Sequence, residues 1–129
     1  MADAAVTEAV TIRVQRFHRW MPQLVAAVAE IGGIDVATLL APSRVGWAAL
    51  LRAAVVLAAR DVFEKGWSDI GREIGGRDHT TVLHAYEKAR RLAAEDGEFR
   101  QLAPLVLAIA RAIAGQPAPS ADVEPELLL

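Results

Sequence analysis

The side chains best suited to chemistry gather in one short stretch, residues 75–85. A double glycine breaks the helical pattern before it, and Asp78 is a residue type that starts helices, so the stretch predicts a turn followed by a new helix. A helix N-terminus offers free N–H groups and partial positive charge, which suit a phosphate, and its first turns fit the major groove of DNA. We therefore expect a DNA-recognition helix here. In order, the stretch reads Gly75-Gly76-Arg77-Asp78-His79-Thr80-Thr81-Val82-Leu83-His84-Ala85.

The first residues of this helix are of types that read DNA bases. Arg77 can bind a phosphate or a guanine edge, and Asp78 can accept a hydrogen bond from cytosine N4. His79 and Thr80 can contact base edges or a thymine methyl group. The alternative is that Asp78 only caps a helix and that its neighbours form a solvated turn.

Further along the same helix, polar residues recur on one face. Thr80 and His84 are one turn apart, and Thr81 and Lys88 are two turns apart, so a single face can present all four. The alternative for His84 is a half-buried packing role. The opposite face is apolar and should point inward, with Val82, Leu83, Tyr86, Ala89 and Leu92.

The elements before this helix complete a helix-turn-helix. Ser68 can cap a short helix that ends at Gly75-Gly76, and Asp78 then starts a helix that runs to about residue 94. Upstream, residues 46–65 form a helix that is apolar around most of its circumference, which is typical of the centre of a bundle, and Gly66 should end it. Trp47 is either a core residue of this helix or a surface contact.

The remaining apolar patterns also have helical spacing. Residues 4–31 predict a helix that Pro22 kinks or divides near Trp20, with Gly32-Gly33 at its end. A short helix capped by Asp35 and a loop over 41–44 follow. Its inward residues should be Val36, Leu39 and Leu40. A last helix covers residues 98–114 and is either straight or bent at Pro104. It should pack against the bundle through Phe99, Leu102, Leu105, Val106 and Ile109.

Composition is consistent with one all-α domain. The chain has 129 residues, and the pattern divides it into an N-terminal helical extension (1–17), a helix-turn-helix bundle (18–115) and an acidic tail (116–129) that we expect to be disordered. The net charge of −2 opposes DNA binding, but it is unevenly distributed. Residues 44–91 contain nine Lys or Arg and six Asp or Glu, a balance of 9 − 6 = +3, whereas residues 92–129 have 2 − 6 = −4.

Several function classes find no support in the sequence. There is no cysteine and the three histidines are not clustered, so we expect no metal site. There is no phosphate-binding loop for ATP and no grouping of nucleophile, base and orienting residue, so we expect no cofactor and no enzyme activity. Without a signal peptide or a membrane span, the expected location is the cytoplasm, in association with the nucleoid.

Residues 70–85 resemble the signature of the C-terminal DNA-binding domain (domain IV) of the bacterial replication initiator DnaA, which has a Trp-repressor-like helix-turn-helix. The resemblance extends loosely over residues 18–115. It implies that Arg44 enters the minor groove from a basic loop and that Arg52 and Arg60 contact phosphates. The loop here is thin in basic residues. The motif positions that the resemblance assigns to bases or phosphates are Arg77, Asp78, His79, Thr80, Thr81 and His84.

Together these observations predict a protein that binds double-stranded DNA at sites like the initiator's boxes and acts by occupancy on replication or transcription. Asp78, His79, Thr80 and Arg44 would give specificity. The residues that would position the DNA backbone are Arg77, Thr81, Arg52, Arg60 and Lys88. The alternative is a module that keeps the fold but binds a replication or regulatory protein through its N-terminal helix or acidic tail. The net negative charge motivates that alternative.

Overall fold

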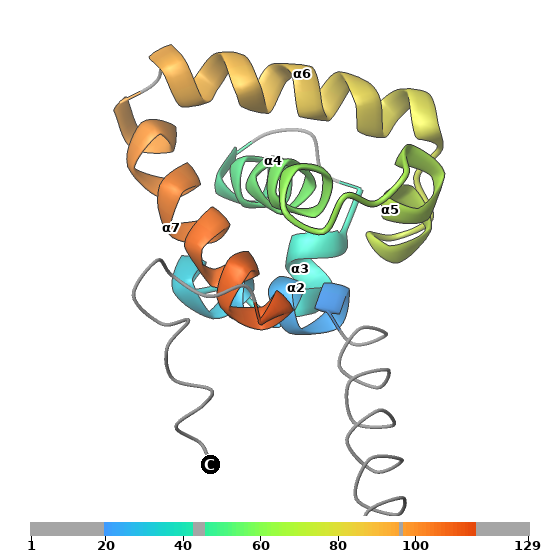
Figure 1. Cartoon of the computed structure of the whole chain (residues 1–129), viewed down its shortest axis with the longest axis horizontal. Helices are drawn as coiled ribbons and strands as arrows, with labels where there is room; N and C mark the ends of the chain where they lie inside the picture. Colours follow the sequence, from blue (N-terminus) through green and yellow to red (C-terminus); the bar gives the residue numbers. More distant parts are fainter. Residues whose placement is uncertain (1–19, 43–45, 96, 116–129) are drawn as a thin grey trace, which may run out of the picture.

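The computed structural model describes residues 20–42, 46–95 and 97–115. This part of the chain is a bundle of helices without strands (Figure 1). The predicted N-terminal extension, the tail and Arg44 lie outside the described residues. In chain order the helices are α2 (Trp20–Gly32), α3 (Val36–Leu40), α4 (Gly46–Asp61), α5 (Trp67–Glu73), α6 (His79–Glu95) and α7 (Gly97–Ala114).

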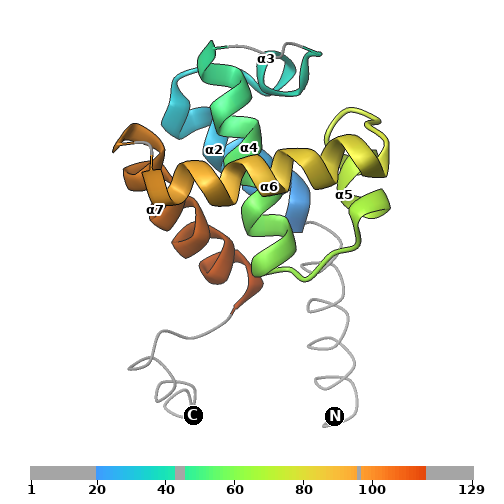
Figure 2. The same cartoon turned by 90° about the horizontal axis from the view of Figure 1, so that it is seen from above.

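Helix α4 is the centre of the bundle, as its apolar sequence predicted. Every residue from Leu51 to Ala59 is buried, and α4 packs against all five other helices (Figures 1 and 2). Its many alanines and valines are small enough for the surrounding helices to approach closely. In Figure 2, α6 crosses over α4, so the exposed side of α6 faces away from the core.

The predicted end of α4 at Lys65 is wrong, because the helix stops at Asp61. Glu64, and not Gly66, takes a left-handed conformation after the helix, with φ at 56°. Val62 and Phe63 leave the helix but stay buried, and the Phe63 ring packs 5.0 Å from the ring of Trp20. Leaving the helix early therefore keeps both side chains in the core.

The predicted cap at Ser68 is also wrong. Helix α5 begins at Trp67, after Gly66, and no side chain caps it. The Trp67 ring packs 5.1 Å from that of Tyr86, whose hydroxyl donates to Asp61 Oδ1 at 2.6 Å. These contacts between α5, α6 and the end of α4 outweigh the local preference for a serine cap.

Other expectations for the smaller elements are confirmed, with two exceptions. Gly33, with φ at 73°, follows the end of α2, and the Asp35 carboxylate accepts from Thr38 N at 2.7 Å, as a cap does. Val36 is 40% exposed, because one helical turn can bury only one face, here that of Leu39. Leu105 is 47% exposed, because Val106, next to it on α7, takes the inward position.

The helix-turn-helix depends on a close approach between α5 and the start of α6. Gly75 and Gly76, with φ at 95° and 74°, make the turn, and Arg77 N donates to Gly71 O at 2.8 Å. A Cβ atom at Gly71 would lie only 2.0 Å from Arg77 O. Because that neighbour is backbone, neither group can move without displacing the turn.

We expect Gly71→Ala to lower the free energy of unfolding by about 1–3 kcal/mol, the usual cost of overpacking. Gly97→Ala is the matched control, because a Cβ atom there would meet nothing within 4 Å. Thermal unfolding followed by circular dichroism measures both. Equal stability of the two variants would contradict the close approach.

Candidate nucleic-acid interface

The start of α6 is organised by Asp78. Its carboxylate accepts from Thr80 N at 2.7 Å and from the Thr81 hydroxyl at 3.3 Å. The backbone bond from Thr80 is the main reason that the pKa of Asp78 lies below its ordinary value. Both oxygens are therefore used in capping the helix, so the capping role considered from the sequence is present whatever else Asp78 contacts.

The polar face predicted for α6 is exposed in the structure. His79, Thr80, Thr81, His84 and Lys88 are all exposed. Val82 and Ala89, on the opposite side of the helix, are buried. The packing role considered for His84 is therefore wrong, and the helix offers an uninterrupted polar surface from its N-terminus over more than two turns.

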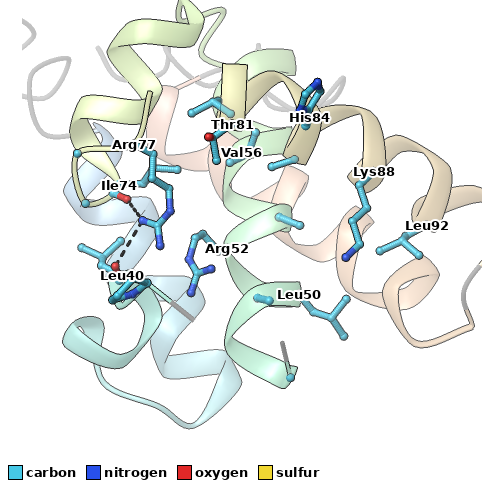
Figure 3. A pocket seen from close by; sticks show the side chains of 18 residues that line it. Leu40, Leu50, Arg52, Val56, Ile74, Arg77, Thr81, His84, Lys88 and Leu92 are labelled. Atoms are coloured by element: carbon cyan, nitrogen blue, oxygen red, sulfur yellow. Dashed lines mark hydrogen bonds between the residues drawn. The ribbon is translucent and has the colours of Figure 1, made fainter. Parts of the chain in front are cut away.

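Arg77 does not project from this surface as a free cation. It is half-buried, and its guanidinium donates to Ile74 O, to Leu40 O at 3.4 Å and to Ala41 O at 2.9 Å (Figure 3). Burial lowers the pKa of Arg77, yet an arginine stays charged under physiological conditions. Its contacts join the glycine turn to the end of α3.

Arg52 corrects an expectation of the resemblance. A phosphate contact needs a guanidinium that faces solvent, but Arg52 is only 8% exposed. Its Nε donates to Leu39 O and its Nη2 to Ala41 O, both at 2.9 Å. Burial, and secondarily the nearby charge of Arg77, lowers the pKa of Arg52. Arg52 therefore holds the end of α3 rather than the surface of a duplex.

Arg60 is likewise engaged within the protein. It is half-buried, its Nη1 donates to Lys65 O at 3.0 Å, and its guanidinium lies 4.1 Å from the centre of the Trp67 ring. It thus joins the end of α4 to the start of α5 and has fewer donors left for a phosphate. Of the predicted cations in the described part of the chain, Lys88 is the one that is exposed.

Residue types alone did not predict that Arg52 and Arg77 donate to the same carbonyl group. Both donate to the Ala41 carbonyl, whose position depends on the path of the chain after α3. One sequence signal was available, because Arg52 lies in the middle of the apolar run of α4 and a charge in such a position needs internal partners. The indole N–H of Trp47, which donates to Gly32 O at 2.7 Å, was also not predicted.

Comparison with known proteins identifies the family of the helices that carry this surface. Residues 21–89 match the family described as bacterial DnaA protein helix-turn-helix. The chain belongs to this family. The matched range includes α3, α4, α5 and the polar face of α6 up to Lys88, so the site described above lies within the DnaA helix-turn-helix.

Individual relatives of this chain belong to the same family. The chain is similar to the chromosomal replication initiator protein DnaA of Streptococcus pyogenes serotype M5 (strain Manfredo) and to that of serotype M1. Each is 35% identical over 78 residues, which cover 60% of this chain and 17% of the relative. The chain therefore spans only a small part of the length of these relatives.

Two other features bear on what the described residues can do. No group of three or more His, Cys, Asp or Glu side chains among them could hold a metal ion. None of their helices is both long and apolar enough to cross a membrane.

We predict that Arg52→Met lowers the free energy of unfolding by about 1–3 kcal/mol, because Leu39 O would lose its charged donor and Ala41 O would keep only Arg77. Arg72→Met is the control, since Arg72 is exposed and should change stability by no more than about 0.5 kcal/mol. Denaturant unfolding of both variants measures the difference. A stable Arg52→Met protein with weakened DNA binding would restore the phosphate-contact role.

A second prediction concerns pH. Since the pKa of Asp78 is lowered on folding, its contribution to stability is complete above its unfolded pKa and is lost as the pH falls through the lower, folded value. Asp78→Ala should therefore unfold at a lower temperature than the parent at pH 7, and the gap should close in acid. Thermal unfolding across pH 2–7 tests this, with Glu87→Ala on the same helix as control. A gap that persists in acid would contradict the capping assignment.

Proposed function

We propose that this protein binds double-stranded DNA sequence-specifically at boxes of the kind the DnaA initiator recognises, with α6 in the major groove. The observation that supports this most is the exposed polar face of α6, which begins at a capped helix N-terminus. The relatives are replication initiators by name, and their helix-turn-helix family includes the residues of this face.

Within this proposal the residues have three roles. His79 and Thr80 lie in the first turn of α6, are exposed and can reach base edges. Arg44, in the loop outside the described residues, would enter the minor groove. Thr81, His84 and Lys88 would contact the DNA backbone or the outer bases. Arg52, Arg60 and Arg77 would act mainly by holding the elements that present this surface.

The protein would act by occupying its site. The sequence contains no phosphate-binding loop for ATP, so the activity proposed for these residues is binding without strand opening. Occupancy of a box would compete with an initiator at an origin, or block a promoter that contains a box. In a bacterial cell this places the protein on the nucleoid.

The direct test is titration of the protein with a duplex that contains an initiator box and with a scrambled duplex, at two salt concentrations. Each phosphate that a Lys or Arg neutralises adds about −0.9 to the slope of log affinity against log salt, so Lys88 and Arg44 alone should give a slope of about −2. Tighter binding of the box duplex supports the proposal. Equal affinity for both would favour the alternative of a protein-interaction module, which the net charge of −2 motivates.

Two variants separate base readout from backbone contact. We predict that His79→Ala with Thr80→Val reduces the preference for the box by about 1–3 kcal/mol for each base that the side chains no longer read. Lys88→Gln should instead weaken binding to both duplexes equally and make the salt slope shallower by about 1. The same titrations measure both effects. If Lys88→Gln altered preference and the double variant did not, the assigned roles would be reversed.

A further inference from the structure

A hollow of about 350 Å³ lies between the end of α4, α6 and α7, and we call it the arginine hollow. Three exposed arginines line it, Arg90 from α6 and Arg100 and Arg111 from α7. Apolar side chains, among them Leu57 and Leu107, form another part of its lining. The arginine hollow shares no lining residue with the larger groove of Figure 3, beside the recognition helix. It is therefore a second, separate surface.

The two arginines of α7 lie on one face of that helix. Arg100 and Arg111 are 11 residues apart, which is about three helical turns, and Pro104 and Leu107 lie between them on the same stripe. Their backbone positions are about 16 Å apart along the helix axis. An elongated ligand with several acids matches this stripe better than a single small anion.

Positive charge predominates in the arginine hollow. Of its lining residues, all within the described part of the chain, Asp61 is the one acid, and its Oδ1 already accepts from the Tyr86 hydroxyl at 2.6 Å. No salt bridge among the described residues joins Arg90, Arg100 or Arg111 to a carboxylate. Water solvates such exposed cations well, so they need no partner. They nevertheless offer charged donors to any carboxylate that is held nearby.

The segment that follows α7 carries acids at a matching spacing. Residues 116–129 contain Asp122, Glu124 and Glu126 and no lysine or arginine. Alternate residues of an extended backbone lie on one face, so the three carboxylates would point the same way over about 13 Å. Pro125 favours this conformation, because proline restricts the residue before it to extended backbone. We propose that this segment folds back along α7 and docks in the arginine hollow.

The segment begins beside the arginine hollow. Arg111 lies in the last turn of α7, and Gly115, with φ at 77°, follows the end of the helix. Prolines at 117 and 119 disfavour a longer helix. The chain thus leaves α7 at the same end as one of the arginines. A reversal over residues 116–119 is enough to bring the acids alongside α7.

After that reversal the acids are in register with the arginines. Residues 120–126 span about 20 Å when extended, and Arg100 lies about 21 Å from the end of α7 along the helix axis. A segment antiparallel to α7 would place its first acid, Asp122, beside Arg111 and its last, Glu126, beside Arg100. The middle acid would face the arginine of α6. Each exposed ion pair is weak alone, so docking depends on all three acids and on the tether, which holds them at roughly mM effective concentration.

Docking in the arginine hollow would keep the acids away from the polar face of α6. Ala93, which lines the arginine hollow, is nine residues after His84 and therefore about half a turn round α6 from it. The arginine hollow and the polar face are thus on opposite sides of this helix. One consequence rests on the proposed function: a released segment would repel the DNA phosphates, and a docked segment would do so less.

Paramagnetic labelling of the full chain tests docking without DNA. The chain has no cysteine, so Leu127→Cys gives a single site for a nitroxide label. In the docked register the label lies near Arg100. We expect it to weaken the amide NMR signals of Ala93 and Ala103, in the arginine hollow, more than that of Ala112, near the end of α7. A segment that is only tethered would give the opposite order, because it is attached at the end of α7, and that order would overturn the proposal.

Neutralising two arginines tests the role of charge. Arg100→Gln with Arg111→Gln should remove the excess attenuation in the arginine hollow, as should about 1 M salt, which screens charges beyond about 3 Å. Arg72→Gln with Arg91→Gln is the matched control, because it changes the net charge equally at exposed positions outside the arginine hollow. The control pair should preserve the attenuation. If the first pair preserves it too, the proposed charge pairing is wrong.

A charge exchange distinguishes direct pairing from a loss of structure. Arg100→Glu with Arg111→Glu should abolish the excess attenuation. Adding Asp122→Lys, Glu124→Lys and Glu126→Lys should restore it, because the same pairs then form with opposite signs. A combined variant that stays without attenuation would contradict direct pairing between the segment and α7.

Two further measurements separate the remaining outcomes. Mixing spin-labelled chains without ¹⁵N with unlabelled ¹⁵N chains should give no attenuation, and attenuation there would assign the arginine hollow to the segment of a second copy and overturn docking within one chain. Changing the three acids to Asn or Gln should raise the affinity for box DNA by a larger factor in the Arg100→Gln, Arg111→Gln chain than in the parent. An equal gain in both would show that the acids are not held away from the duplex and would overturn the docked arrangement. A chain that showed docking but bound no duplex would disprove the proposed function and leave docking intact.

Discussion

The interaction on which the rest of the site depends is the capture of the carbonyl groups at the end of α3 by two arginines. Arg52 comes from the buried centre of α4 and Arg77 from the turn before α6, and both donate to Ala41 O. The last carbonyls of a helix have no partner within it, so they need donors from elsewhere. By meeting at one place, the two side chains join the end of α3 to both the core and the turn before α6.

This arrangement has an electrostatic cost that constrains its surroundings. Two guanidinium groups lie near each other, one of them buried, and each has its pKa lowered by loss of water. Carbonyl dipoles compensate only partly for the lost hydration. The close packing of Gly71 against the backbone of Arg77 holds the turn in place despite this cost.

The sequence predicted most of the fold because its signals were local. Helical periodicity, the double glycine at 75–76 and the caps Asp35 and Asp78 depend on neighbouring residues, and the structure confirms them. The helix boundaries that were predicted wrongly are set by tertiary contacts. The end of α4 and the start of α5 follow the packing of Phe63 and Trp67, which no nearby residue reveals. For the site, the exposed face of α6 was predictable, whereas the identity of the Arg52 partners was not, because the two carbonyls are 11 and 13 residues away in the chain.

The division of labour among the cations also explains how a chain of net charge −2 can be built to present a DNA-reading helix. Arginine is suited to holding several carbonyls because its donors are planar and stay charged when buried. Using Arg52 and Arg77 in this way orients α6 accurately but leaves fewer cations to attract phosphate at long range. Recognition would then rest more on the fit of His79 and Thr80 to base edges than on general attraction.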